Sequence, residues 1–137
     1  MSRPLVIAHR GASGERPENT ASAFERAIEL DADMIETDLH VSRDGVIVIH
    51  HDASLERFGD PGEIRDRSAS ELAALNAAPG GSAPERMPTL LDLLEGFGSR
   101  MHFNLELKVG LNAPYDGLEE RVFAEVEARG LLPRMLF

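Results

Sequence analysis

The sequence predicts an α/β fold with a mainly parallel sheet, and three observations lead to this class. Short apolar runs typical of strands alternate along the chain with segments of helical periodicity. Once one hairpin is set aside, the element order is β-α-β-loop-α-β-α-β. Polar and ionisable residues follow the apolar runs, as they do where the carboxyl ends of parallel strands form a functional face. The length of 137 residues suits a single domain.

The expected strands are apolar runs bounded by turn-forming residues. They lie at residues 5–8, 34–41, 46–51 and 101–109, and a further strand begins in the last four residues. The first run is followed by the Gly- and Pro-containing segment "HRGASGERPEN" and is expected to be a buried strand, because all four of its residues are apolar.

The segment "SRDG" joins the second and third strands, and its Gly45 suits the positive φ of a hairpin turn. If the two valines that flank this segment pair with each other, Glu36 lies opposite His51. A shift of one residue would exchange the positions of His50 and His51. The pairing therefore favours His51 as the histidine that returns to the second strand, without settling the choice.

Helices are expected where apolar residues recur at helical spacing and capping residues stand at the ends. They lie at residues 20–30, within 68–75, at 88–98 and at 116–129. Thr89 is an N-cap candidate with Asp92 three residues later, as in a capping box. Gly130 ends the last helix. Most of residues 59–81 is expected to be loop.

Composition excludes several classes of function. The chain has no cysteine, which excludes disulfides, cysteine-ligated zinc and a thiol nucleophile. Its formal net charge of −10 argues against nucleic acid as a partner, because the phosphate backbone requires a basic surface. The N-terminal residues lack a secretory signal pattern, and no apolar run approaches the length of a membrane span. The expected location is the cytoplasm.

Carboxylates on two strands are candidates for a metal site. Side chains alternate along a strand, so Glu36 and Asp38 share one face, as do Asn104, Glu106 and Lys108. A single carboxylate would be read as a charge at the solvent rim. Three that converge on one edge of a sheet favour a hard cation, Mg²⁺ or Ca²⁺, held by Glu36, Asp38 and Glu106.

Two of the five histidines follow strands that reach the same edge. His9 ends the first strand and His51 the third, and imidazoles titrate near neutrality, as a general acid and a general base require. A lone histidine is more often a structural residue, and His40 and His102 are interpreted in that way.

Local positive charge is necessary if this acidic chain binds an anion. Arg10 and Lys108 lie beside the candidate histidine and carboxylates and could supply that charge. A cation site, two imidazoles and two basic side chains, without a thiol or an evident serine nucleophile, suit phosphoester chemistry.

The order of the short motifs resembles the glycerophosphodiester phosphodiesterase family. HRG at residues 9–11, PENT at 17–20, E-x-D at 36–38, HD at 51–52 and E-x-K at 106–108 occur in the family's order. Each motif alone is weakly specific, whereas the set is highly specific. The resemblance covers residues 5–108, approximately.

That resemblance implies a (β/α)₈ TIM-barrel domain that uses Mg²⁺ or Ca²⁺ and cleaves glycerophosphodiesters to glycerol 3-phosphate and an alcohol, a reaction of lipid and glycerol metabolism. It resolves the choice between the histidines in favour of His51. It implies an acid–base pair of His9 and His51, metal ligands Glu36, Asp38 and Glu106, phosphate contacts from Arg10 and Lys108, and support from Glu18 and Asn19. Asp52 either orients its neighbours or caps the following turn. Residues 59–88 correspond to a small insertion over the mouth of the barrel.

The length departs from a complete barrel, which needs roughly 250 residues. Residues 1–137 are expected to form the first half of the domain, about three and a half βα units with the hairpin and the insertion. The first and last strands would then be open apolar edges. The chain is expected to be a fragment, or to associate as two half-barrels into a homo-oligomer.

Two other functions remain open at this point. One is a non-catalytic half-barrel or partner subunit that keeps metal or phosphate binding without turnover. The other, weaker one is a sphingomyelinase-type phospholipase D, whose members are usually secreted and disulfide-bonded, unlike a chain without cysteine.

Overall fold

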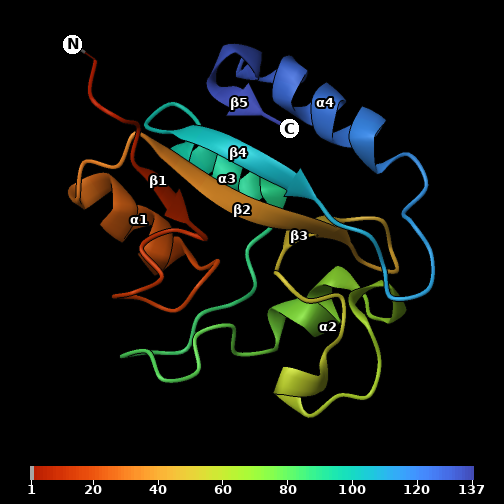
Figure 1. Ribbon diagram of the computed structural model, residues 1–137. Coiled ribbons are helices and arrows are strands. Elements are labelled where there is room, and N and C mark those ends of the chain that lie inside the picture. Colours follow the sequence, from red (N-terminus) through yellow and green to blue (C-terminus); the bar gives the residue numbers. More distant parts are fainter. Residues whose placement is uncertain (1) are drawn as a thin grey trace.

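A five-stranded sheet organises the computed structural model, which describes residues 2–137 (Figure 1). Its parallel strands run in the order β1-β2-β4-β5, and β3 pairs antiparallel with β2. The strands are β1 (Ile7–His9), β2 (Met34–Val41), β3 (Ile47–Ile49), β4 (His102–Leu107) and β5 (Met135–Leu136). The parallel α/β class predicted from the sequence is confirmed.

The helices lie close to the positions that periodicity predicted. They are α1 (Ala21–Glu29), α2 (Ala69–Ala73), α3 (Leu90–Phe97) and α4 (Leu118–Ala128), with 3₁₀ turns at Glu56–Phe58, Ile64–Asp66 and Leu132–Arg134. Thr20 caps α1, and the predicted capping box of Thr89 and Asp92 is present at the start of α3. No helix among residues 2–137 has both the length and the hydropathy needed to cross a membrane.

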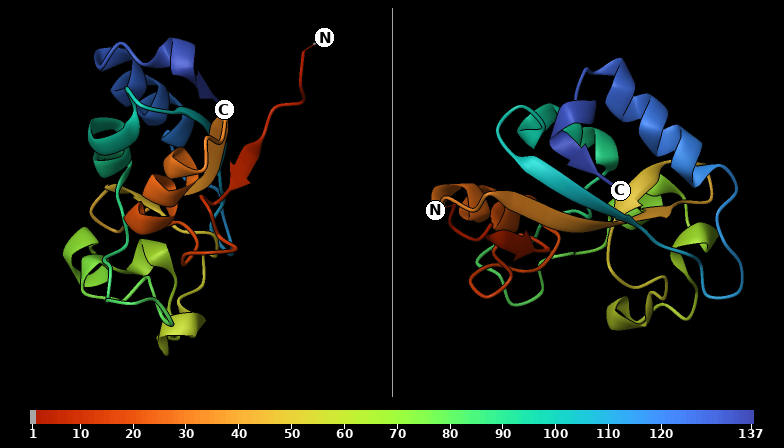
Figure 2. Two further views of the ribbon diagram at one scale, coloured as in Figure 1. Left: turned by 90° about the vertical axis from the view of Figure 1, so that its left-hand side faces the viewer. Right: turned by 45° about the horizontal axis from the view of Figure 1, so that its top comes forward.

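Helices α1, α3 and α4 bury one face of the sheet. The odd-numbered side chains of β2 and β4, such as Ile35 and Phe103, pack with apolar residues from all three helices in one core. The rings of Phe24 and Phe103 meet edge to face with centroids 6.2 Å apart. Figure 2, left, shows α3 and α4 on the same side of the strands. Because side chains alternate along a strand, the even-numbered residues of β2 and β4 point to the other face.

The insertion predicted at residues 59–88 has its own small core. Ile64, Leu72 and Met87 pack with Leu55 and with Val48 of β3. The helix predicted within residues 68–75 is α2, and Ser68 caps it. This second core fixes the insertion to the hairpin, beside the segment that carries His51.

Two expectations about the strands are wrong. The first strand is not buried: Leu5 and Val6 precede it, and Ile7 within it is 49% exposed, because β1 pairs only with β2 among the described strands and lies at the sheet edge. The third strand ends at Ile49, two residues earlier than predicted.

The register of the hairpin also differs from the prediction by one residue. Val41 pairs with Ile47, and Leu39 pairs with Ile49. The reason is a three-residue loop, residues 43–45, that ends in Gly45 at φ +86°. Ser42 closes the loop, since its backbone N–H donates to the carbonyl of Val46 and its hydroxyl accepts from the N–H of Val46. The pairing of Glu36 with His51 is therefore absent.

Both edges of the sheet expose apolar residues. Val6 is 55% exposed beside β1, and Leu136 of β5 is 54% exposed. Unpaired strand edges of this kind are templates for pairing with another chain. We expect the 137-residue chain to self-associate, with a weight-average sedimentation coefficient that rises with concentration. The double variant Val6→Lys/Leu136→Lys should sediment as a monomer, because lysine on an edge strand opposes pairing.

A control for this measurement replaces an apolar residue away from both edges. Leu30, at the end of α1, is 49% exposed, so Leu30→Lys changes charge and hydropathy in the same way. It should leave the association unchanged. A wild-type chain that sediments as a compact monomer at all concentrations would contradict the expected pairing of edges.

Candidate active site

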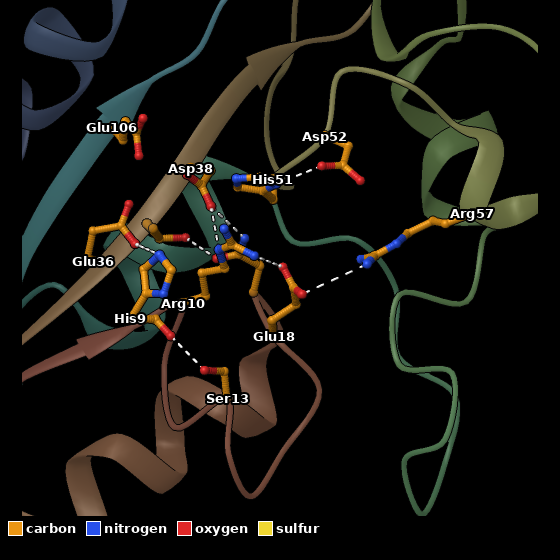
Figure 3. A network of polar contacts seen from close by, with 12 residues as sticks. His9, Arg10, Ser13, Glu18, Glu36, Asp38, His51, Asp52, Arg57 and Glu106 are labelled. Carbon is orange, nitrogen blue, oxygen red and sulfur yellow. Dashed lines mark hydrogen bonds and ion pairs between the residues drawn. The ribbon is translucent and has the colours of Figure 1, made fainter.

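The carboxylates predicted to bind metal converge on the face of the sheet that the three helices leave open. The register between β2 and β4 pairs Asp38 with Glu106 and Glu36 with Asn104. Oxygen atoms of Glu36, Asp38 and Glu106 all lie within 4.8 Å of one another. Figure 3 shows these side chains together at the C-terminal half of the strands. The alternation of side chains along the two strands, together with the register between them, thus builds the cluster.

Like charge and burial make this cluster a site that a cation would stabilise. Burial, followed by repulsion from Asp38, raises the pKa of Glu36 to about 7. Among the described residues, neither carboxylate oxygen of Glu36 has a hydrogen-bond partner, and Oδ1 of Asp38 has none. Buried carboxylate oxygens left without partners are costly, and hard divalent cations prefer oxygen ligands. These residues therefore fit a divalent cation.

Lys108 supplies positive charge at the same place. Its Nζ lies 2.9 Å from Oε1 of Glu106 and 3.3 Å from Oδ1 of Asp38. The hydrogen bond from Lys108 lowers the pKa of Glu106. For Lys108 itself, burial would lower the pKa, but the contacts with Glu106 and Asp38 outweigh burial and raise it. Lys108 stays protonated and can face an anion.

Arg10 enters the site from the loop after β1 in a left-handed backbone conformation, with φ +59°. Its backbone N–H donates to the carbonyl of Glu36 at 2.8 Å, which ties the loop to β2. Its guanidinium donates to Oε2 of Glu18 at 2.8 Å, and its Nε lies 3.5 Å from Oδ2 of Asp38. Oε1 of Glu18 lies 3.8 Å from a guanidinium nitrogen of Arg57. Glu18 thus fixes the direction of Arg10.

Asn19 holds the second carboxylate of β2. It is 2% exposed and also adopts positive φ, at +55°. Its Nδ2 donates to Oδ2 of Asp38 at 2.9 Å, and its Oδ1 accepts from the hydroxyl of Thr37 at 2.8 Å. The two bonds leave Oδ1 of Asp38 directed at the cluster. Glu18 and Asn19, which were predicted to support the site, thus contact Arg10 and Asp38 respectively.

His9 lies at the exposed side of the carboxylate cluster. Its Nε2 is 3.5 Å from Oε2 of Glu36, and its side chain is 66% exposed. The hydroxyl of Ser13 donates to the His9 carbonyl at 2.9 Å, so the loop is held while the ring remains accessible. A groove of about 1080 Å³ opens here, with His9 and Glu106 among its lining residues.

His51 lies beside Asp38 on the other side of Arg10 (Figure 3). It reaches this place from the bend after β3 rather than from a strand position opposite Glu36. Its Nδ1 is 2.6 Å from Oδ1 of Asp52, so Nδ1 carries the proton and Nε2 is left to accept one. Partial burial would raise the pKa of Asp52, but the hydrogen bond with His51 and nearby positive charges outweigh burial and lower it.

The contact between Asp52 and His51 bears on the two interpretations of Asp52. The turn that follows is closed by Ser54, whose hydroxyl accepts from the N–H of Glu56. Asp52 instead faces the imidazole of the preceding residue. The geometry favours the orienting interpretation over the cap.

His50 is buried just beyond β3, where its backbone N–H donates to the carbonyl of Asp38 at 3.1 Å. The observed register places it across from Asp38, not on the opposite face, as the predicted register had implied. It is 5% exposed, its ring centroid lies 5.3 Å from that of Phe58, and its Nε2 has no hydrogen-bond partner among the described residues. Burial, with a smaller effect of Arg57, lowers its pKa from the ordinary 6.5 to about 4. The structural interpretation of His50 agrees with this environment.

We expect His50 to make the protein sensitive to mild acid. Its folded-state pKa lies below its unfolded one, so between pH 6.5 and about 4 the unfolded chain binds a proton that the folded chain does not. Its contribution to stability is full above pH 6.5 and decreases by about 3 kcal/mol as pH falls to 4. In urea unfolding, the stability of wild type relative to His50→Leu should therefore fall by this amount between pH 6.5 and 4. His102→Leu, at an exposed histidine, should keep the pH slope of wild type; the same pH slope in His50→Leu as in wild type would exclude His50 as the cause.

Three residues at the site were not predicted to take part. Arg57 reaches Glu18 from the 3₁₀ turn after the HD motif. His40 and Tyr115 join each other at 2.8 Å, and His40 also contacts the carbonyl of His51. The even spacing from Glu36 to His40 on one strand could have indicated that His40 shares the face of the site. Nothing local to Tyr115 indicates its partner 75 residues away.

Known proteins resemble this chain in sequence and in structure. The sequence pattern described as "Glycerophosphoryl diester phosphodiesterase family" matches residues 9–131. A "Glycerophosphodiester phosphodiesterase" of Caldanaerobacter subterraneus subsp. tengcongensis is 37% identical over 139 residues, which cover 98% of this chain and 57% of that protein. The chain spans about half the length of the curated relatives it matches, with coverage of 57% and 48% for two of them.

Two solved structures share the arrangement of strands and helices. The glycerophosphodiester phosphodiesterase from Agrobacterium tumefaciens str. C58 superposes with a TM-score of 0.84 at 30% identity, covering 97% of this chain and 56% of that one. An Oleispira antarctica phosphodiesterase in complex with the product sn-glycerol-3-phosphate superposes with a TM-score of 0.73 at 39% identity, covering 90% of this chain and 51% of that one.

Proposed function

Because the chain belongs to the glycerophosphoryl diester phosphodiesterase family, we propose that it carries the catalytic half of an enzyme that hydrolyses glycerophosphodiesters to glycerol 3-phosphate and an alcohol. The single observation that carries this proposal is the convergence of the three carboxylates with two imidazoles and two basic side chains on one face of the sheet. The relative whose structure holds sn-glycerol-3-phosphate supports the same product.

The histidines would transfer the protons of the reaction. Asp52 keeps a proton on Nδ1 of His51, so Nε2 of that ring can accept one. His9, on the other side of the carboxylates, is exposed to the groove. We assign the two rings as an acid–base pair: one takes a proton from the water that attacks phosphorus, and the other protonates the alkoxide that leaves as the P–O bond to the alcohol breaks.

The carboxylates Glu36, Asp38 and Glu106 would hold one divalent cation, Mg²⁺ or Ca²⁺. When bound, such a cation supplies charge neutralisation for the non-bridging phosphate oxygens. The side chains of Arg10 and Lys108 would bind the phosphate directly, since both already face the acidic cluster.

A second candidate function is a half-barrel that binds cation and phosphate without turnover. The observation that favours it is that the chain covers only 57% and 48% of two of its relatives. The two candidates share the same cluster and differ only in whether the groove beside His9 is complete enough to hold the alcohol. Turnover, rather than binding, distinguishes them.

The test is hydrolysis of glycerophosphocholine followed by release of glycerol 3-phosphate. We expect activity with Mg²⁺ or Ca²⁺, loss of activity with EDTA, and recovery when the cation is restored in excess. Activity that survives EDTA would contradict the assignment of the carboxylates. Absence of activity together with cation binding by calorimetry would instead support the non-catalytic half-barrel.

A further inference from the structure

We propose that His40 and Tyr115 form a positioning pair for His51: the imidazole of His40 holds the backbone carbonyl of His51, and the hydroxyl of Tyr115 holds His40 in the tautomer that can do so. The inference deepens the proposed function and rests on it, because the pair matters for turnover only if His51 moves a proton.

His40 lies on β2 two residues after Asp38, and it is 1% exposed. Its Nε2 is 3.0 Å from the carbonyl oxygen of His51. A carbonyl oxygen only accepts hydrogen bonds, so Nε2 must carry the ring proton. Nδ1 is then an acceptor, and the hydroxyl of Tyr115, 2.8 Å away, is its donor. Both ring nitrogens of the buried His40 therefore make hydrogen bonds: Nε2 donates to His51, and Nδ1 accepts from Tyr115.

The contact between His40 and His51 lies just beyond the end of β3, where backbone pairing with β2 stops. β3 ends at Ile49, and the last backbone bond between β2 and this segment runs from the N–H of His50 to the carbonyl of Asp38. One residue further on, the side chain of His40 takes the place of the strand partner. His51 is therefore held at two points, by His40 at its carbonyl and by Asp52 at its ring.

Tyr115 is itself held by the insertion. Its ring meets that of His40 edge to face, with centroids 5.7 Å apart. The guanidinium of Arg65 lies over the same ring at 4.6 Å, and its Nη2 donates to the carbonyl of Ala113 at 2.6 Å. Arg65 also lies 2.6 Å from the buried carboxylate of Glu63. Arg65 of the insertion thus holds the loop after β4, and Tyr115 of this loop holds His40.

This arrangement predicts an effect on turnover rather than on binding. Neither His40 nor Tyr115 is among the groups that would hold the cation or the phosphate. A displaced general acid or base costs rate, and a shift of about 1 Å can cost about 100-fold. Loss of the His40 contact should therefore lower kcat by about 10–100-fold and leave KM and the cation affinity within about twofold.

The experiment compares three variants in glycerophosphocholine hydrolysis. His40→Leu removes the contact, and His40→Gln keeps an amide N–H at about the position of Nε2. Tyr115→Phe keeps the ring and removes only the hydroxyl. We expect the full loss of kcat in His40→Leu, recovery to within about threefold of wild type in His40→Gln, and a loss of intermediate size in Tyr115→Phe. His102→Leu is the matched control, because it removes an exposed histidine from the start of β4.

Two further readouts separate positioning from a general effect on the fold. In a His51→Ala background, His40→Leu should have no additional effect on the residual rate, since it acts through His51. In nuclear magnetic resonance spectra, the ring signals of His51 should broaden or double in His40→Leu and stay single in His40→Gln.

Wild-type kcat in His40→Leu, or an additional loss in the His51→Ala background, would overturn the inference. Equal losses in His40→Leu and His40→Gln with matching losses of thermal stability would also overturn it. An inactive wild-type chain would count against the proposed function alone, because the ring signals of His51 would still decide whether His40 and Tyr115 position it.

Discussion

Replacing His51 by alanine is expected to lower the kcat of glycerophosphocholine hydrolysis by about 10²–10⁴-fold, the usual contribution of a general acid or base. The expectation follows from the orientation of the ring. Asp52 holds Nδ1 at 2.6 Å, and Nε2 is left as the one nitrogen that can exchange a proton with substrate. KM should change little, because the cationic side chains and not the imidazole bind the phosphate.

Two matched variants make this measurement specific to His51. His50→Ala removes the neighbouring histidine, whose buried ring packs on Phe58, and should cost stability but not the chemical step, because His50 is not one of the two rings assigned to proton transfer. His102→Ala removes an exposed histidine and should cost neither. Asp52→Asn should fall between wild type and His51→Ala, since an amide can still accept from Nδ1 without the charge. A His51→Ala variant within threefold of wild type would exclude the acid–base assignment.

Replacing Glu36 by glutamine is expected to change cation affinity and apoprotein stability in opposite directions. Burial and the neighbouring Asp38 raise the pKa of Glu36 to about 7, above its ordinary 4.5, so the folded chain binds a proton that the unfolded chain releases between these values. The contribution of Glu36 to the stability of the cation-free protein should therefore decrease as pH rises from 4.5 to 7, by up to about 3 kcal/mol. It opposes the contribution of His50 over this range, so each is measured as the difference between wild type and the variant of that residue.

Glu36→Gln removes that charge, so the variant without cation should be more stable than wild type at pH 8. With cation the order should reverse. A bound cation stabilises by an amount that grows with concentration over Kd, about 2.7 kcal/mol at 100 times Kd. Removal of one of three carboxylates should weaken binding at least as much as removal of an outer-shell partner, about 10–100-fold. Calorimetric titration and thermal unfolding with and without Mg²⁺ or Ca²⁺ measure both effects.

Glu119→Gln is the control for this pair of measurements. Glu119 lines the same groove and is exposed, so the change of net charge is identical, but it lies outside the carboxylate cluster. It should bind cation like wild type and show no gain in stability at pH 8. If Glu36→Gln bound the cation with wild-type affinity, the cluster could not be the metal site.

Local sequence patterns were sufficient to determine much of the fold. Strand β2 occupies the predicted residues, because its mostly apolar odd positions and mostly polar even positions follow the two-residue period of a strand. Helix α3 begins where Thr89 and Asp92 form the expected capping box. The same period placed Glu36 and Asp38 on one face of β2. Each of these features depends on residues within a few positions of one another.

Contacts between distant segments decided the rest, because their energies depend on which elements pack together. The three-residue loop shifted the hairpin by one residue and placed His51 beside Asp38 through a bend, not through strand pairing. Strand β1 is exposed although its residues are mostly apolar, because it lies at the edge of the sheet. The link from Tyr115 through His40 to His51 joins residues 75 and 11 positions apart. The sequence determined which groups the site contains, and tertiary packing determined which of them lie together at the carboxylate cluster.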